Sequence, residues 1–178
     1  TTAMSNVESN GVAPALFPDE ARELYTRGLA HLDGDGVAKD PDRAAACLLQ
    51  AAEAGHASAQ FMVGALYQMG ENLGFAQNSE EAVHWYRAAA LQGHRVAQFN
   101  LGFCLETGEG TEKDERSAVY WYRRAAAQGD EDALKALEEM GVGVEESGDA
   151  GLASGAAVDA VPPAAKELAV EAVALAPA

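Results

Sequence analysis

Basic residues and cysteines are scarce in this chain of 178 residues. Its 12 Lys and Arg residues are outnumbered by 28 Asp and Glu residues, which gives a formal net charge of −16 at pH 7. Nucleic acids and anionic membranes bind proteins through basic surfaces, so we expect neither as a partner. Cys47 and Cys104 are too few for a disulfide scaffold and lack the spacing of a zinc site, which favours a reducing compartment.

A long apolar run is also missing. No stretch approaches the roughly 20 apolar residues that a membrane-spanning helix needs. Residues 1–11 read TTAMSNVESNG and lack the basic start and the apolar centre of a secretion signal. These absences predict a cytoplasmic location, unless a leader has been removed. Apolar residues nevertheless make up 48% of the sequence, so a folded core is expected.

What the sequence does contain is a pair of alternating blocks that recurs along the chain. The first block reads ELYTRGLAHLDG, AQFMVGALYQMG and AQFNLGFCLETG in its three copies, at residues 23–34, 59–70 and 97–108. The second block reads RAAACLLQAAEAG, EAVHWYRAAALQG and SAVYWYRRAAAQG, at residues 43–55, 81–93 and 117–129. A fourth first block begins at Ala133 without a second block after it. Such a period predicts a repeat architecture.

Each block has the apolar spacing of an amphipathic helix. In the second block, Trp85 and Tyr86 fall on one face, and the third copy repeats the pattern. In the first block, glycine stands at the same register in all three copies, at Gly28, Gly64 and Gly102. Glycine costs about 1 kcal/mol against alanine within a helix, so we expect these positions to let a neighbouring helix approach closely.

Turn and capping residues separate the blocks. Gly-x-Gly turns follow two of the first blocks, at residues 34–36 and 108–110, and neither has the Lys of a phosphate-binding P-loop. An N-cap residue precedes each second block, at Asp40, Asn78 and Asp114. Glu81 stands where it would complete a capping box with Asn78. Two extra residues before Asn78 predict a bulged loop in the second repeat.

A single hairpin of this kind cannot cover its own apolar face, whereas stacked hairpins bury a continuous layer. The sequence therefore predicts an all-α protein, a right-handed α-solenoid of helix-turn-helix repeats with a C-terminal capping helix and a flexible tail. Four parts are expected: a disordered segment over residues 1–18, the solenoid over 19–141, an acidic Gly- and Ala-rich linker over 142–163, and a weakly helical tail over 164–178. The tail is a candidate for docking on the solenoid, fraying in solution or binding a partner.

The repeats closely resemble Sel1-like repeats, relatives of the tetratricopeptide class. That family's pattern is roughly A-x-x-x-L-G-x-x-Y-x-x-G-x-G-V-x-x-D-x-x-K-A-x-x-W-Y-x-x-A-A-x-x-G, and residues 97–129 follow it closely. The resemblance covers residues 23–140. Cys47-Leu48 replaces Trp-Tyr and Arg27-Gly28 replaces Leu-Gly in the first repeat, so a looser first hairpin is expected. The resemblance implies a non-catalytic adaptor of bacterial type that binds partner proteins on its concave face, without a cofactor.

By analogy with the tetratricopeptide groove, that face is expected to be lined by first-block residues outside the packing stripe: Arg22, Tyr25, Leu29, Leu32, Phe61, Ala65, Gln68, Phe99, Phe103 and Glu106. Tyr25, Phe61 and Phe99 share a register and form a predicted ladder of rings. Such a groove fits an extended or helical peptide with apolar anchors, and its acidic rim suits Lys or Arg flanks. Interhelical packing would use the same rings, so core and binding roles both stay open.

Other candidate sites have simpler interpretations. His56 and His94 share a register, but the separation of one repeat, about 10 Å, is too large for two ligands of one zinc ion. Turn or capping roles are therefore preferred for both histidines. The carboxylates show no isolated pair for acid–base catalysis, and Cys47 and Cys104 are expected to be inert apolar residues.

The sequence thus predicts no catalytic residue and no metal site, yet two rival functions stay open. One is a regulatory subunit or a hydrolase-like enzyme with a dispersed site. The other is a self-assembling solenoid, since the ends of such arrays can stack and the opening hairpin is atypical.

Overall fold

The computed structural model describes residues 18–70 and 74–144. Within these ranges the chain forms seven α-helices and no strand, as predicted. The helices are α1 (Pro18–Asp33), α2 (Pro41–Glu53), α3 (Ala57–Met69), α4 (Ser79–Leu91), α5 (Arg95–Thr107), α6 (Glu115–Ala126) and α7 (Glu131–Glu139). Residues 1–17 of the predicted N-terminal segment, most of the predicted linker and the predicted tail lie outside the described residues, whereas Pro18 begins α1.

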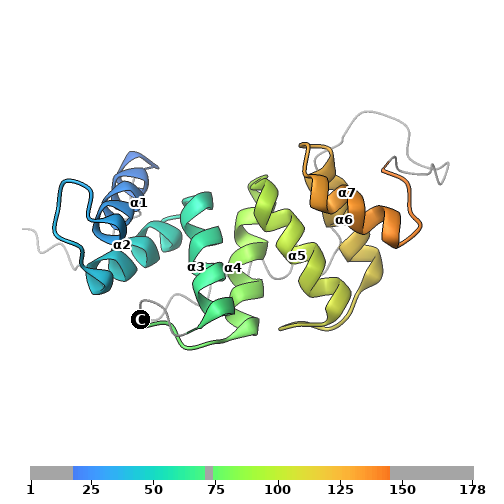
Figure 1. The fold of residues 1–178 in the computed structure, drawn as a ribbon, viewed down its shortest axis with the longest axis horizontal. Helices are drawn as coiled ribbons and strands as arrows, with labels where there is room; N and C mark the ends of the chain where they lie inside the picture. Colours follow the sequence, from blue (N-terminus) through green and yellow to red (C-terminus); the bar gives the residue numbers. More distant parts are fainter. Residues whose placement is uncertain (1–17, 71–73, 145–178) are drawn as a thin grey trace, which may run out of the picture.

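The helices form a single elongated row from α1 at one end to α7 at the other (Figure 1). Each helix makes its most extensive contacts with the helices next to it in the sequence. The pairs α1–α2, α3–α4 and α5–α6 are the three predicted hairpins, and α7 packs against α6 as a half-repeat. This arrangement is an α-solenoid rather than a compact bundle, which confirms the predicted fold class.

The predicted N-caps hold the start of the second helix in each hairpin. Asp40 accepts a hydrogen bond from one backbone N–H of the following turn, and Asn78 and Asp114 each accept from two. Pro41 occupies the first turn of α2, where its missing N–H costs no helical hydrogen bond. The expected capping box at Asn78 is only half formed, because the Asn78 N–H donates to the carbonyl of Tyr67.

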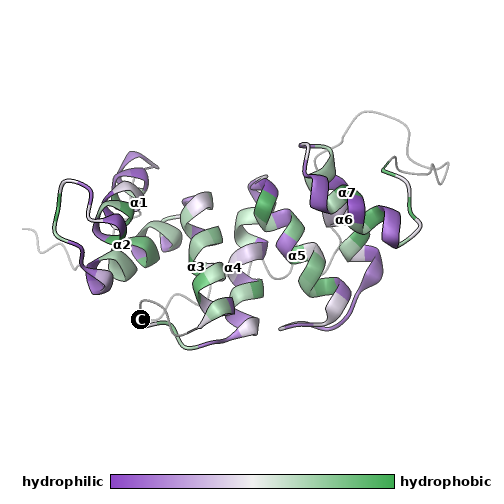
Figure 2. Ribbon diagram, viewed as in Figure 1, coloured by the Kyte–Doolittle hydropathy of each residue, from purple (hydrophilic) through white to green (hydrophobic). Residues whose placement is uncertain are grey.

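Two clusters of buried residues run along the row. One is centred on α2 and α3, and the other spans α4 to α7. Trp121, Tyr86 and Tyr122 are the largest buried side chains. The helix α7 closes the second cluster with buried Ala133 and Leu137 and exposes its charged residues, as expected of a polar capping helix. The hydropathy colouring in Figure 2 follows this division, with much of α7 purple.

The first hairpin is as closely packed as the other two. The contacts between α1 and α2 are as extensive as those between α3 and α4 or between α5 and α6. Leu48, which replaces the tyrosine of the other copies, is fully buried and packs against Gly28. The expectation of a looser first hairpin is therefore wrong, because leucine fills the space beside the glycine.

The first residues of the predicted linker continue the packing of the solenoid. The N–H of Val142 donates to the carbonyl of Leu137, and the Val142 side chain packs partly buried against the second cluster. The carbonyl of Gly143 accepts a hydrogen bond of 3.1 Å from Nε of Arg123. The contacts of the solenoid thus extend beyond the predicted boundary at residue 141.

Candidate partner-binding surface

Glycine in the first helix of each hairpin lets the second helix approach closely. A Cβ atom on Gly64 would lie 2.8 Å from Cδ1 of Tyr86, and one on Gly102 would lie 2.8 Å from Cδ1 of Tyr122. Carbon atoms in contact need about 3.5–4 Å, so a larger residue would push the two helices apart. The predicted reason for these glycines is therefore confirmed, and each glycine fixes where the tyrosine ring lies.

The hydroxyl groups of the two buried tyrosines form hydrogen bonds with residues of the predicted binding face. Oη of Tyr86 donates to Oε1 of Gln68 at 2.7 Å, and Oη of Tyr122 donates to Oε2 of Glu106 at 2.7 Å. Burial raises the pKa of Tyr86 to about 12. Burial, followed by the hydrogen bond to Glu106, also raises the pKa of Tyr122. Both phenols therefore stay protonated and hold Gln68 and Glu106 in fixed positions.

The predicted ladder of rings is half-buried. Tyr25 stacks on His56 with ring centres 4.6 Å apart, and Phe61 stacks on His94 at 4.8 Å. Phe99 lies tilted against a buried tyrosine, with ring centres 5.6 Å apart. Each ring packs against a buried cluster and stays partly exposed. The rings are thus neither sealed between helices nor fully displayed, and they combine packing with a surface position.

The two stacked histidines also cap helices, which confirms the capping role preferred for them. Nδ1 of His56 accepts from the N–H of Ala59, and Nδ1 of His94 accepts from the N–H of Ala97, both at 3.2 Å. Asp130 has the same role at the start of α7. Burial, together with the charge of a neighbouring arginine, lowers the pKa of both histidines. Among the described residues, no three His, Cys, Asp or Glu side chains gather as metal ligands would.

The most exposed apolar side chains beside the ladder come from α3 and α5. Met69 is 63% exposed and Phe103 is 41% exposed. Met62 and Ala65 are half-buried and fall on the same face of α3 as Met69 by helical spacing. The helix α3 has no charged residue, and Figure 2 shows it mostly green. Sequence reasoning missed Met62 and Met69, although the absence of charge over residues 57–69 was a signal that could have found them.

The ten residues predicted to bind a partner all lie on first-block helices, and none of them is buried. Arg22 and Phe103 are exposed, and the other eight are half-buried. Those eight are Tyr25, Leu29 and Leu32 on α1, Phe61, Ala65 and Gln68 on α3, and Phe99 and Glu106 on α5. The positions are compatible with a continuous face, while its use in binding stays a prediction.

Two buried glutamines link neighbouring hairpins, and sequence reasoning missed both. Nε2 of Gln60 donates to the carbonyl of Ala52 in the preceding hairpin, and Nε2 of Gln98 donates to the carbonyl of Ala90, each at 3.1 Å. The side-chain oxygen of each glutamine accepts a 2.7 Å hydrogen bond from a glutamine at the end of its own hairpin. The shared Ala-Gln-Phe of the second and third copies was the available signal.

The buried cysteine, Cys104, is a poor candidate for a nucleophile. Cys104 is buried, and burial raises the pKa of its thiol to about 11. A thiol in that state is protonated at neutral pH and is a poor nucleophile. Cys47 is half-buried on α2, and both cysteines are free thiols.

Stacked helical hairpins, closed by glycine and offering a half-buried face of rings, define a helical-repeat protein with a surface suited to contacts with other proteins. The Sel1 repeat family model matches residues 27–56, 57–94 and 95–130. The chain belongs to the Sel1 repeat family. These three ranges are called repeats 1, 2 and 3.

Similar proteins include regulators and a solved structure. Chitin synthase regulatory factor 3 of Schizosaccharomyces pombe is 34% identical over 125 residues, which cover 70% of this chain and 13% of that protein. Chitin synthase regulator SKT5 of Saccharomyces cerevisiae is 30% identical over 126 residues, which cover 62% of this chain and 18% of that protein. The crystal structure of a Sel1 repeat protein from Oxalobacter formigenes has a TM-score of 0.65 at 36% identity, over 68% of this chain and 92% of that one.

Family membership and the regulator names of the relatives support a protein-interaction role. The chain covers only 13% and 18% of the two yeast proteins, so their activities are not assigned to it. The relatives come from yeasts and the solved structure from a bacterium, so the predicted bacterial type stays a prediction. Among the described residues, every helix is too short or too polar to span a membrane.

Proposed function

We propose that this protein is a non-catalytic adaptor that holds a segment of a partner protein along the face formed by α1, α3 and α5. The observation that carries the proposal is the exposed apolar surface on α3, which has no charged residue, and on α5. Met69 of α3 and Phe103 of α5 are exposed on the helices that carry the half-buried rings of Phe61 and Phe99. Apolar side chains that are exposed among the described residues form a surface suited to bind apolar side chains of a partner.

The chemistry of the partner follows from the distribution of charge along this face. Glu106 and Glu139 both lie close enough to Tyr122 to raise its pKa, after the larger effect of burial. Carboxylates therefore gather towards α7, whereas α3 is uncharged. We propose a partner segment with apolar anchors over α3 and α5 and a Lys or Arg towards α7.

The regulator names of the yeast relatives support a role in which binding controls another protein. The free thiols of Cys47 and Cys104 support a reducing compartment, and we propose the cytoplasm. The C-terminal tail is proposed to compete for the same face. Deletion of residues 145–178, which keeps the contacts of Val142 and Gly143, is expected to tighten partner binding, and unchanged affinity would count against this competition.

Site-specific photo-crosslinking tests the adaptor proposal. A benzoylphenylalanine is placed at Phe103 in one variant and at Met69 in a second. A third variant carries it at Val37, which is 44% exposed in the α1–α2 loop and serves as the matched control. We expect partner adducts, identified by mass spectrometry, from the first two variants and not from the third. Adducts of equal yield at all three positions, or at Val37 alone, would reject the proposed face.

A further inference from the structure

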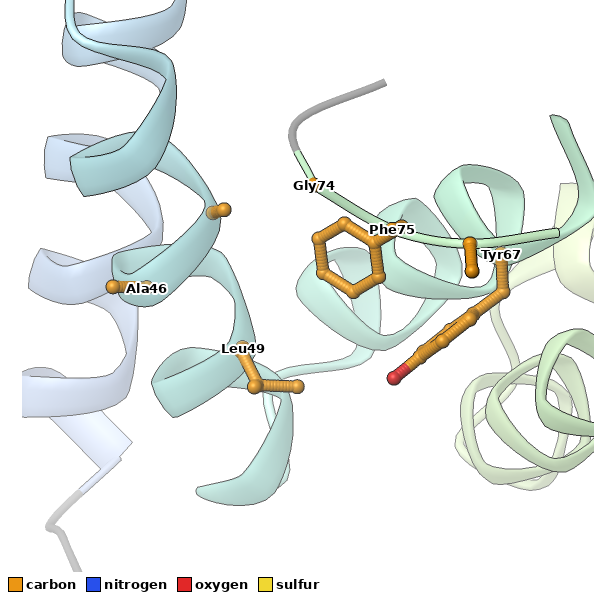
Figure 3. Close-up of a pocket in the computed structure, with 7 residues that line it drawn as sticks. Ala46, Leu49, Tyr67, Gly74 and Phe75 are labelled. Carbon is orange, nitrogen blue, oxygen red and sulfur yellow. The ribbon is translucent and has the colours of Figure 1, made fainter. Parts of the chain in front are cut away.

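A separate apolar pocket lies between α2 and the loop that leads into α4. It has a volume of about 360 Å³ and is lined by Ala45, Ala46, Leu49, Tyr67, Gly74, Phe75 and Ala76. Figure 3 shows Leu49 of α2 facing Phe75 and Tyr67 across the hollow. None of the ten residues of the predicted partner-binding face lines this pocket. It is therefore a second candidate site, which does not depend on the first.

The pocket exists because repeat 1 has small side chains where the other repeats have large ones. Ala45 and Ala46 stand at the register where α4 has Val83 and His84, and Cys47 stands at the register of Trp85. The third copy has valine, tyrosine and tryptophan at the same positions. The smaller side chains of repeat 1 leave room for the hollow on α2.

Phe75, in the loop of repeat 2, covers part of that hollow. Phe75 is 9% exposed and meets Tyr67 edge-on, with ring centres 4.8 Å apart and planes at 88°. These two rings form one wall, and Ala45, Ala46 and Leu49 form the other. A hollow of this size with apolar walls suits one bulky side chain, such as Phe, Leu or Trp.

Tyr67 brings a phenol to the wall of the pocket, and two carboxylates outside the lining act on it. The hydroxyl of Tyr67 points towards the hollow in Figure 3 and has no hydrogen-bond partner among the described residues. Burial, followed by the charges of Glu81 and Glu53, raises the pKa of Tyr67. Both carboxylates are on exposed residues, so the surroundings of the pocket are negatively charged.

The pocket could be occupied by the C-terminal tail, by a second copy of the chain or by a segment of a partner protein, and the negative charge around the pocket distinguishes among them. Residues 145–178 contain a single basic residue, Lys166, among six acidic ones, and a second copy of the chain has the same net charge of −16. Both would be repelled by Glu53 and Glu81. A partner segment that is apolar and basic would instead be attracted.

We propose that this pocket binds one bulky apolar side chain of a partner protein that is flanked by Lys or Arg. The apolar side chain enters between Leu49 and Phe75, and the basic flanks lie towards Glu53 and Glu81. The hydroxyl of Tyr67, which is directed towards the hollow, accepts a hydrogen bond from the incoming segment. Such a site gives the adaptor a second anchoring point on α2, away from the face of α1, α3 and α5.

The full chain can be titrated with short peptides while backbone amide resonances are followed by NMR. The probes are acetyl-GKFKG-amide, acetyl-GKAKG-amide and acetyl-GEFEG-amide. We expect the first peptide to shift the amides of Ala45, Leu49 and Phe75. The second and third should bind at least about fivefold more weakly, because each lacks either the apolar anchor or the basic flanks. No shift at these amides, or equal binding of the acidic peptide, would overturn the proposal.

Two substitutions taken from the other repeats provide matched variants. Ala46→Tyr introduces the residue that Tyr120 represents in repeat 3 and should weaken acetyl-GKFKG-amide by about tenfold, because it fills the pocket. The reverse change, Tyr120→Ala, is the control and should leave binding unchanged. Leu49→Arg introduces the residue found in both other repeats, at Arg87 and Arg123, and should reverse the preference towards acetyl-GEFEG-amide.

These variants also separate this proposal from the adaptor face, because they change no residue of α1, α3 or α5. Far-ultraviolet circular dichroism and thermal unfolding show whether each variant is folded. A folded Ala46→Tyr variant that binds the peptide as tightly as the unchanged chain would overturn the pocket proposal. Crosslinking at Phe103 would still report on the adaptor face in that case.

Discussion

The two junctions between complete repeats are closed in different ways. Between repeats 2 and 3, the α5–α6 loop lies on the start of α4, where Gly110 contacts the backbone of Ser79 and Oγ of Ser79 donates to Glu109 at 3.3 Å. Between repeats 1 and 2, the corresponding loop is two residues longer and is held by Phe75. The hairpins on both sides of each junction are alike. The packing of the hairpins therefore sets the arrangement of the helices, and the loops only close the spaces between hairpins.

The closest contact in this comparison is at Gly110. Gly110→Ala should lower the free energy of unfolding by about 3 kcal/mol or more, because a Cβ would overlap the Ser79 backbone and φ is +70°. Gly36 has a φ of +71° but no neighbour within 4 Å, so Gly36→Ala should cost only about 1 kcal/mol. Urea unfolding measures both values. Equal losses would mean that the loop contact between repeats 2 and 3 contributes nothing.

The other junction is tested by removing the phenylalanine that closes it. Phe75→Ala should lower the free energy of unfolding by about 2 kcal/mol, since it removes a buried ring and its contact with Tyr67. Val37→Ala, in an exposed loop position of repeat 1, should change it by less than about 0.5 kcal/mol. If thermal and urea unfolding show the same small loss for both variants, Phe75 is not what closes this junction.

The buried tyrosines of repeats 2 and 3 donate to different acceptors, a neutral amide in repeat 2 and a carboxylate in repeat 3. Tyr122→Phe should cost about 2 kcal/mol, because it leaves the part-buried carboxylate of Glu106 without its donor. Tyr86→Phe removes a donor from the neutral amide of Gln68 and should cost about 1 kcal/mol. Chemical unfolding of the two variants gives the comparison. A larger loss at Tyr86 would show that the charge on the acceptor is not the deciding factor.

The smallest expected effect is a dependence on pH at the histidine caps. The pKa values of His56 and His94 are lowered in the folded chain, so the unfolded chain takes up protons first as the pH falls. Their contribution is therefore complete above an unfolded pKa of about 6.5 and is lost as the pH falls through the folded values. A protonated Nδ1 cannot accept a hydrogen bond from the backbone. On acidification, the contribution of each cap to the free energy of unfolding should therefore fall by about 0.5–1 kcal/mol.

The cap of α7 shows how to remove this dependence. His94→Asp copies the cap of α7, where a carboxylate oxygen of Asp130 accepts from the backbone in place of an imidazole nitrogen. Unfolding of this variant at several pH values should show a smaller loss between neutral pH and pH 5 than the unchanged chain shows. His84→Asp, on an exposed residue that caps no helix, should leave the loss as it was. An identical pH profile for His94→Asp would exclude the cap as its source.

Recurrence in the sequence was sufficient to predict the hairpins and their order. Gly64 and Gly102 stand at the same register of the first block, and each has a tyrosine at the same register of the second block that follows. This recurrence has one simple physical cause, a close crossing of two helices. The caps at Asp40, Asn78 and Asp114 recur for an equally local reason. Features that depend on neighbouring residues in sequence, or on exact repetition, were therefore predictable.

Features that depend on a single copy were not predictable. Phe75 belongs to an insertion without a counterpart, and nothing in its sequence neighbours indicates that it turns inward. The half-buried state of Phe61 and Phe99 also had to come from the structure, because helical spacing gives a face but not how deep that face lies. The same limitation applied to Met69, which spacing alone does not distinguish from a core residue.

The buried glutamines have a mechanical consequence. Gln60 and Gln98 each tie the start of a hairpin to the end of the helix before it, so neither of these joints can rotate without breaking a hydrogen bond inside the protein. At the last joint the equivalent residue is Leu134, whose apolar side chain cannot form such a hydrogen bond. Under tension applied to its two ends, the array should therefore yield first where α7 meets α6, while the first two joints still move as one stiff rod.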